Sequence, residues 1–190
     1  IFKNQIDATQ PLKKQLWQQT IVEKIKNQGL LLETITGNKN SFEFLASKVL
    51  SGDTTNMEGV AASQYWKSFF DMNFKRERFG DYPNNFLNYG YAILRAATAR
   101  ALSGSGLLNT LGIHHKSKYN AFALADDIME PFRPIVDEKV FEKLIDIYSK
   151  KSPQQFLPES LKGINATQVA TDIFKSSKLT SYNGLKELLS

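Results

Sequence analysis

The chain has 190 residues, of which 42% are apolar and 23% charged, as in an ordinary soluble globular protein. Its net charge of +5 is compatible with an anionic partner, although so mild an excess is weak evidence by itself. The absence of cysteine excludes disulfide frameworks and thiolate metal sites, and no apolar run approaches the roughly 18 residues of a membrane span. The start, Ile1-Phe2-Lys3, has no initiator Met and no signal-peptide core, so we interpret the chain as beginning inside a longer protein.

Apolar residues recur at helical spacing through the first part of the chain, with glycine at the breaks. Pro11 is well placed in the first turn of an opening helix, which we expect to end at Gly29 before a short element over residues 30–36. Asn40 or Ser41 can cap the helix that follows.

Further helices are expected over residues 55–72, 84–102 and 121–132, and another from Pro134. The chain shows neither strand alternation nor repeats. We therefore predict an all-α fold, with residues 1–150 forming one helical domain and residues 151–190 forming its helical tail.

An acid, Glu58, lies near the start of the 55–72 helix and is followed by Gly59 and other small residues. The helix dipole favours an acid in a first turn, so a capping role is as plausible here as a ligand role. Small neighbours would also let a ligand or another backbone come close.

The only two histidines, His114 and His115, are adjacent and precede the 121–132 segment. Asp127 and Glu130 in that segment stand three residues apart, so a helix would put both on one largely apolar face. One imidazole and two carboxylates are a plausible ligand set for a divalent metal. The alternative is a helix end with solvated acids and a histidine on a loop, and this stretch alone does not exclude it.

Basic residues gather in the loop before residue 84, where Arg76 and Arg78 could contact phosphates through their guanidinium groups. The alternative is a solvated loop. Arg133 is a further candidate for a backbone contact, but we expect it to form an ion pair inside the fold.

Three separated motifs together match the motifs of one known protein family in their order and approximate spacing. They read N-M-E-G-V-A-A over residues 56–62, P-N-N-F-L-N-Y-G-Y over residues 83–91, and L-G-I-H-H followed by D-I-M-E-P-F-R-P over residues 111–134. Over residues 9–137 the sequence resembles the CRISPR-associated integrase family that inserts new spacers, specifically its type II branch.

The resemblance implies a helical catalytic domain with one metal site. In this chain the matching ligands are Glu58, His115 and Glu130, and the metal is Mg²⁺ or Mn²⁺. His115 fits the fourth position of the family's G-x-x-H motif, so His114 is assigned no metal role. Asp127 is a weaker candidate, either as a ligand or as an acid that supports one.

The same resemblance implies a metal-dependent endonuclease and integrase that joins 3′-hydroxyl DNA ends to a CRISPR array by transesterification. The implied partners are double-stranded DNA (the spacer precursor and the CRISPR repeat), a small dimeric adaptation protein and a second copy of the chain. The implied location is the cytoplasm of a prokaryotic cell. The family's β-rich N-terminal domain has no counterpart in this sequence, so we expect exposed apolar surface around Phe2 and the first helix, and weak dimerisation.

Two other functions are compatible with a helical chain of this kind. One is a non-catalytic DNA-binding or assembly module of the same adaptation complex. The other is a di-iron carboxylate bundle, which would require paired Glu-x-x-His motifs that this sequence lacks.

Overall fold

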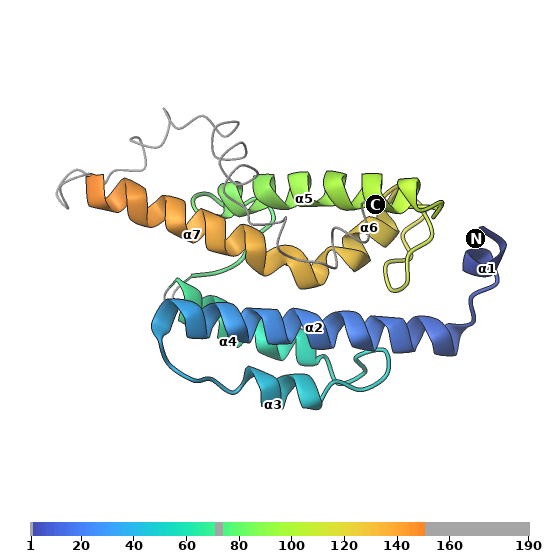
Figure 1. Cartoon of the computed structure of the whole chain (residues 1–190), viewed down its shortest axis with the longest axis horizontal. Helices are drawn as coiled ribbons and strands as arrows, with labels where there is room; N and C mark the ends of the chain where they lie inside the picture. The colour runs from blue at the N-terminus through green and yellow to red at the C-terminus, as the bar shows by residue number, and fades with distance from the viewer. Residues whose placement is uncertain (1, 71–73, 151–190) are drawn as a thin grey trace. The chain divides into compact units, whose positions relative to one another are not determined.

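The computed structural model describes residues 2–70 and 74–150, and every regular element in these stretches is helical. The predicted all-α fold is therefore confirmed for this part of the chain, whereas the expected tail over residues 151–190 lies outside it. Within the described part, no helix is both long and apolar enough to cross a membrane. The elements are α1 (Phe2–Ile6), α2 (Gln10–Thr36), α3 (Phe42–Ser47), α4 (Met57–Phe69), α5 (Asn84–Gly104), α6 (Ala123–Ile128), the 3₁₀ helix η1 (Glu130–Phe132) and α7 (Arg133–Lys150). Figure 1 labels the seven α-helices.

The chain divides into two compact units. The first comprises the residues up to Lys75 together with Arg95–Pro134, and the second comprises Arg76–Leu94 together with the chain from Ile135. Helices α5 and α7 therefore contribute residues to both units. All of the predicted metal ligands lie in the first unit, whereas the basic loop before α5 lies in the second.

The long helix α2 is continuous, although the sequence predicted a stop at Gly29 and a separate element over residues 30–36. That prediction was wrong because Gly29 is a packing position: a Cβ added there would lie only 2.5 Å from the Cβ of Phe42. The missing side chain lets the start of α3 approach α2 closely. The helix ends instead at Gly37, whose φ is +71° and whose N–H donates to the carbonyl of Glu33.

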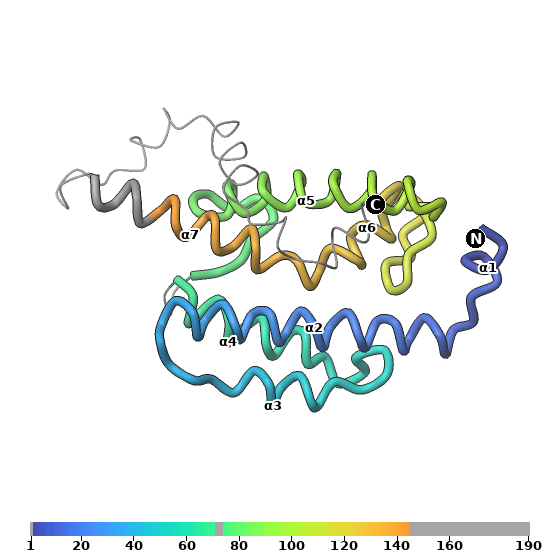
Figure 2. Tube along the Cα trace, viewed as in Figure 1, coloured from blue at the N-terminus to red at the C-terminus, as the bar shows by residue number. Residues whose placement is uncertain are grey.

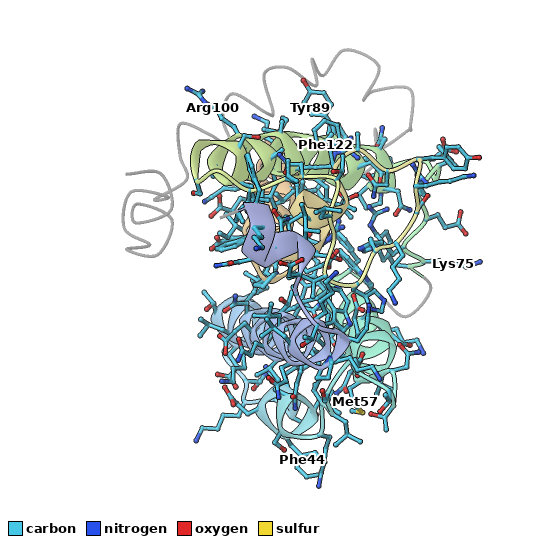
Figure 3. All side chains as sticks on the ribbon, turned by 90° about the vertical axis from the view of Figure 1, so that its right-hand side faces the viewer. Phe44, Met57, Lys75, Tyr89, Arg100 and Phe122 are labelled. Carbon is cyan, nitrogen blue, oxygen red and sulfur yellow. The ribbon has the colours of Figure 1, made fainter. Side chains whose placement is uncertain are left out.

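Helices α2, α3 and α4 pack together in the first unit. Figure 2 shows the chain reversing direction between α2 and α3, and again between α3 and α4. The helices bury apolar side chains against one another, each of which contributes about 1.5–3 kcal/mol when fully buried. These side chains are Ile21 and Ile25 of α2, Phe42 of α3, and Tyr65 and Phe69 of α4. Phe44 projects from α3 away from α2 and is exposed (Figure 3).

Exposed apolar side chains do occur at the start of the chain, as the sequence predicted. They are contributed by α1 and by the first turns of α2, namely Phe2, Ile6, Leu12 and Leu16. The side chain of Gln5 attaches α1 to the rest of the unit, because its amide donates to the carbonyl of Leu108 and accepts the N–H of the same residue.

Residues 121–132 were expected to form one helix that carries Asp127 and Glu130 on one face, and this was wrong. The segment consists of α6, which ends at Ile128, and η1, which begins at Glu130. Pro131 has no N–H with which to continue an α-helical ladder. The two acids therefore have different partners: Asp127 binds the histidine loop, whereas Glu130 contacts α2.

Candidate metal centre

Glu58 lies in the first turn of α4, and the start of this helix is capped by other residues. The carboxylate of Asp53 accepts the N–H groups of Met57 and Glu58 at 2.8 and 3.0 Å. Asn56, whose φ is +53°, accepts the N–H of Gly59. Because these groups already satisfy the helix end, the Glu58 carboxylate is not needed as a cap and is available for another role. Capping also explains why this helix begins at Met57 rather than at residue 55; it ends at Phe69 rather than at residue 72.

The glycine after Glu58 lies close against this cap. A Cβ at Gly59 would lie 2.7 Å from the Nδ2 atom and 2.9 Å from the Oδ1 atom of Asn56. The Glu-Gly pair of the motif thus lets the cap close over the helix start beside the acid.

Lys24 of α2 joins Glu58 to Glu130. Its Nζ atom lies 2.5 Å from Oε1 of Glu58 and 2.6 Å from Oε2 of Glu130, and the lysine is buried. Burial, the largest influence on its pKa, would lower it, but Glu130 and Glu58 outweigh burial and raise the pKa of Lys24 above its ordinary 10.5. The two acids that the sequence assigned to one metal therefore meet on one cation, which is an ammonium group.

Glu130 is buried and also pairs with the following helix. Its Oε1 atom accepts from Nε and Nη2 of Arg133 at 2.8 and 2.7 Å, which confirms the internal ion pair expected of Arg133. Burial would raise the pKa of Glu130, but the charges of Lys24 and Arg133 hold it below its ordinary 4.5. Two carboxylates and two cations thus form a charge-balanced cluster.

Asp127 organises the histidine loop. It is fully buried, and its Oδ2 atom accepts the backbone N–H groups of Ile113 and His114 at 2.6 and 2.9 Å. Its Oδ1 atom lies 2.5 Å from Nδ1 of His115. The hydrogen bond to Asp127 raises the pKa of His115 above its ordinary 6.5, against the opposing effect of burial. Holding Nδ1 in this way fixes the ring and leaves Nε2 as the nitrogen that could bind a metal.

Gly112 is a position where a side chain would not fit between this loop and α6. A Cβ there would lie 2.4 Å from the His115 carbonyl oxygen and 2.9 Å from Oδ2 of Asp127. The glycine of the G-x-x-H motif therefore permits the loop to wrap around the buried carboxylate.

Trp17 of α2 contacts both histidines. Its ring stacks on that of His114 with centroids 4.2 Å apart and planes 9° from parallel. The ring of His115 meets it edge-on, with centroids 6.3 Å apart. Thus α2 contacts the histidine loop through Trp17 and the acidic pair through Lys24.

The predicted ligands are brought together only in part. Glu58 and Glu130 share the ammonium of Lys24, whereas His115 is held by Asp127. Among the described residues, no group of three or more His, Asp or Glu side chains is arranged to hold a metal ion. The acidic pair nevertheless fits a cation, because it already binds one: the buried Oε2 atom of Glu130 contacts the ammonium of Lys24 at 2.6 Å. The charge of Glu130 also contributes to the raised pKa of His115.

The two arginines proposed for DNA contact differ in their surroundings within the second unit. Arg76 donates to Oδ1 of Asn84 at 2.9 Å and to Oδ1 of Asn88 at 2.5 Å, so it ties the loop to the start of α5. Arg78 is exposed, with its guanidinium 5.4 Å above the exposed ring of Phe79. Of the two, Arg78 presents its guanidinium to solvent.

The family of this chain is established by its match to the sequence model of one protein family. Residues 3–159 match the model described as CRISPR associated protein Cas1. The chain belongs to the Cas1 family. The CRISPR-associated endonuclease Cas1 of Neisseria meningitidis serogroup C (strain 8013) is 46% identical over 140 residues. The match covers 72% of this chain and 45% of that protein, so this Cas1-family chain spans less than half the length of its relative.

Solved structures share the fold of the Cas1-family chain. A CAS1 protein from Thermotoga maritima aligns with a TM-score of 0.73 and 16% identity, over 98% of this chain and 68% of that one. A casposase bound to its integration product aligns with a TM-score of 0.66 and 21% identity, over 88% and 56%. At these identities the likeness establishes the helical fold.

Sequence reasoning missed two residues of this Cas1-family site, Lys24 and Trp17. The signal for Lys24 was present: it follows Ile21 and precedes Gln28 at helical spacing, so it falls on the buried stripe of α2. A lysine on a buried stripe requires a partner, because an unpaired buried ammonium is costly.

Proposed function

We propose that this Cas1-family chain is the catalytic part of a DNA endonuclease and integrase that depends on a divalent metal. The proposal rests on one observation. Glu58 and Glu130 come from distant parts of the sequence, yet both carboxylates contact the same cation, the ammonium of Lys24. The names of the relatives add support, because one is an endonuclease and one fold neighbour is bound to an integration product.

The proposed ligands are Glu58, Glu130 and His115. The carboxylates supply hard oxygen donors suited to Mg²⁺ or Mn²⁺, and the imidazole favours Mn²⁺. Asp127 would act on the site through His115, since it holds Nδ1 and leaves Nε2 as the nitrogen for the metal. When bound, the metal would polarise the target phosphate and offset charge on the entering or leaving oxygen.

The proposed reaction is transesterification. The 3′-hydroxyl oxygen of one DNA end forms a bond to the target phosphorus, the bond to the old 3′-oxygen breaks, and one proton is lost and one gained. No ATP is needed, because one phosphodiester replaces another. Water in place of the hydroxyl would give hydrolysis, which accounts for nuclease activity at the same site.

The proposed partners follow from this reaction and from the family. They are duplex DNA in the form of spacer precursor and CRISPR repeat, a small dimeric adaptation protein, and a second copy of the complete protein. Arg78 is the better placed of the two loop arginines for a phosphate. The proposed location is the prokaryotic cytoplasm.

Strand transfer tests the proposal directly. The protein, extended to the full length of its relatives, is incubated with a labelled DNA duplex and a CRISPR array plasmid in Mn²⁺, Mg²⁺ or chelator. Joined and nicked products are expected with either ion and none with chelator. Duplex binding without nicking or joining under any condition would instead support the assembly-module function.

A further inference from the structure

Lys24 has an unusual position for a lysine, because it lies on the buried face of α2. Its Nζ atom contacts Glu58 of α4 and Glu130 of η1, so one ammonium links three elements. One turn further on, Asn27 donates to the carbonyl of Pro131 at 2.8 Å and fixes α2 against η1. The ammonium is therefore held in place by the packing of the helices as well as by its charge.

The charges explain why a cation is needed at this point. Glu58 and Glu130 are both drawn to a single atom, and Arg133 neutralises only the far oxygen of Glu130. Without Lys24, two partly or fully buried carboxylates would face each other and repel. An ammonium at 2.5–2.6 Å from both acids offsets that repulsion.

We propose that Lys24 is a positioning residue that holds Glu58 and Glu130 together in the metal-free protein and that a divalent ion must displace to bind. The inference rests on the metal-dependent function proposed above. Mg²⁺ and its relatives bind carboxylate oxygens at about 2.0–2.1 Å, so the ion and the ammonium cannot both lie between the same two oxygens. Each cation stabilises the acidic pair, and each excludes the other.

If a metal ion must displace the Lys24 ammonium, then removing that ammonium should have opposite effects on the stability of the metal-free protein and on its affinity for the metal. Removing the ammonium lowers the stability of the metal-free protein, because the two carboxylates lose their shared counter-charge. The same change strengthens metal binding, because no internal cation has to leave. We expect a roughly tenfold lower Kd for Mn²⁺, within the usual range for coupling between two ligands. A lysine that only stabilised the fold, without occupying the place of the metal, would produce the first effect without the second.

The matched variants are Lys24→Met and Lys26→Met. Lys26 lies on the same helix but is only partly buried, and its partner is Glu23 at 3.3 Å. Mn²⁺ affinity is measured by calorimetry and by electron paramagnetic resonance of free Mn²⁺, and melting midpoints are measured with chelator and with saturating Mn²⁺. For Lys24→Met we expect tighter Mn²⁺ binding, a lower midpoint in chelator and a larger rise on adding Mn²⁺. Lys26→Met should match the wild type.

A double variant keeps the test decisive if Lys24→Met folds poorly without metal. Lys24→Met/Glu58→Gln removes one negative charge together with the positive one, so its midpoint in chelator should recover towards the wild type. Failure to recover would overturn the inference, as would equal or weaker Mn²⁺ binding by Lys24→Met. If neither the wild type nor Lys24→Met binds Mn²⁺, the proposed metal site itself fails and this inference falls with it.

Discussion

The carboxylate of Asp127 lies 2.5 Å from Nδ1 of His115 and also accepts the backbone N–H groups that precede the ring. One buried acid therefore fixes both the backbone of the histidine loop and the orientation of the imidazole. The sequence offered Asp127 either as a ligand or as an acid that supports one, and in this structure it holds the histidine that we propose as a ligand.

Replacing this acid should destabilise the first unit. Asp127→Asn leaves buried N–H groups without a charged acceptor, and we expect a loss of about 2–4 kcal/mol in the free energy of unfolding. Urea denaturation measures the loss. The neighbouring Asp126→Asn is the matched control, since Asp126 is only partly buried and hydrogen-bonds the side chain of Asn120. Equal stability of the two variants would show that Asp127 does not organise the loop.

The proposed ligands should be required for chemistry but not for DNA binding. We expect Glu58→Ala, His115→Ala and Glu130→Ala to lose roughly 10²–10³-fold or more in strand-transfer rate with Mn²⁺ or Mg²⁺ in the full-length protein. His114→Ala should lose much less, because its ring stacks on Trp17 rather than facing Asp127. Gel-shift affinity for a duplex should survive all four changes. Strong transfer by His115→Ala with an inactive His114→Ala would reverse the assignment of the histidines.

The glycine of the histidine loop gives a steric test. Gly112→Ala puts a Cβ 2.4 Å from the carbonyl oxygen of His115, so the loop must shift at a cost of about 1–3 kcal/mol. Gly104→Ala is the matched control, because nothing lies within 4 Å of its added Cβ. The control should be neutral or slightly stabilising. Thermal melts of both variants check this, and a harmless Gly112→Ala would show that the loop has room to spare.

Acid should weaken the metal-free protein through Glu130. Its pKa in the folded state is held below 4.5, so the unfolded chain binds the proton more tightly. The contribution of Glu130 to stability is therefore complete above about pH 4.5 and is lost as pH falls through the lower folded-state pKa. Melting midpoints in chelator should fall less steeply below pH 4.5 in Glu130→Gln than in the wild type. Parallel curves would mean that the pairs with Lys24 and Arg133 contribute nothing.

Substitutions of the two loop arginines should affect different properties: Arg76 contributes to the stability of the fold, and Arg78 to the affinity for DNA. Arg76→Ala removes hydrogen bonds to Asn84 and Asn88, so we expect unfolding to cost about 1–3 kcal/mol less. Arg78→Ala should leave the melting midpoint unchanged and weaken duplex binding. It should also reduce the slope of log binding constant against log salt concentration by about one. Binding titrations at several salt concentrations distinguish the two, and an unchanged salt slope in Arg78→Ala would remove it as a phosphate contact.

Much of the fold could be predicted from the sequence because local patterns determine it. Apolar spacing and proline positions were sufficient for α5 and for the start of α7. The errors have physical causes that one sequence does not display. Gly29 could be recognised as a packing residue only once Phe42 was known to lie against it. Asp127 and Glu130 followed helical spacing, but Pro131, which comes after both, has no N–H to donate to the carbonyl of Asp127 and interrupts the α-helical ladder.

The residues of the candidate site could be chosen from the sequence, but the contacts between them could not. The motifs selected Glu58, His115 and Glu130, and the structure joins the two acids through a lysine that belongs to none of those motifs. Such a contact spans distant parts of the chain and carries no local pattern. What the sequence did contain was a lysine on the buried face of a helix, which is a reason to look for paired acids.

Helix α2 is unbroken between Trp17 and Lys24, and this fixes the angle between their two side chains about the helix axis. Trp17 and Lys24 lie about two turns apart, roughly 10 Å along one helix, and one contacts the histidine loop while the other contacts the acids. Inserting a single residue between them would rotate one contact by about 100° relative to the other, whereas inserting about two whole turns would restore the angle and lengthen the separation. The spacing of these two side chains along α2 therefore sets how the histidine loop and the acidic pair are aligned. Neither side chain needs to touch the DNA to have this effect.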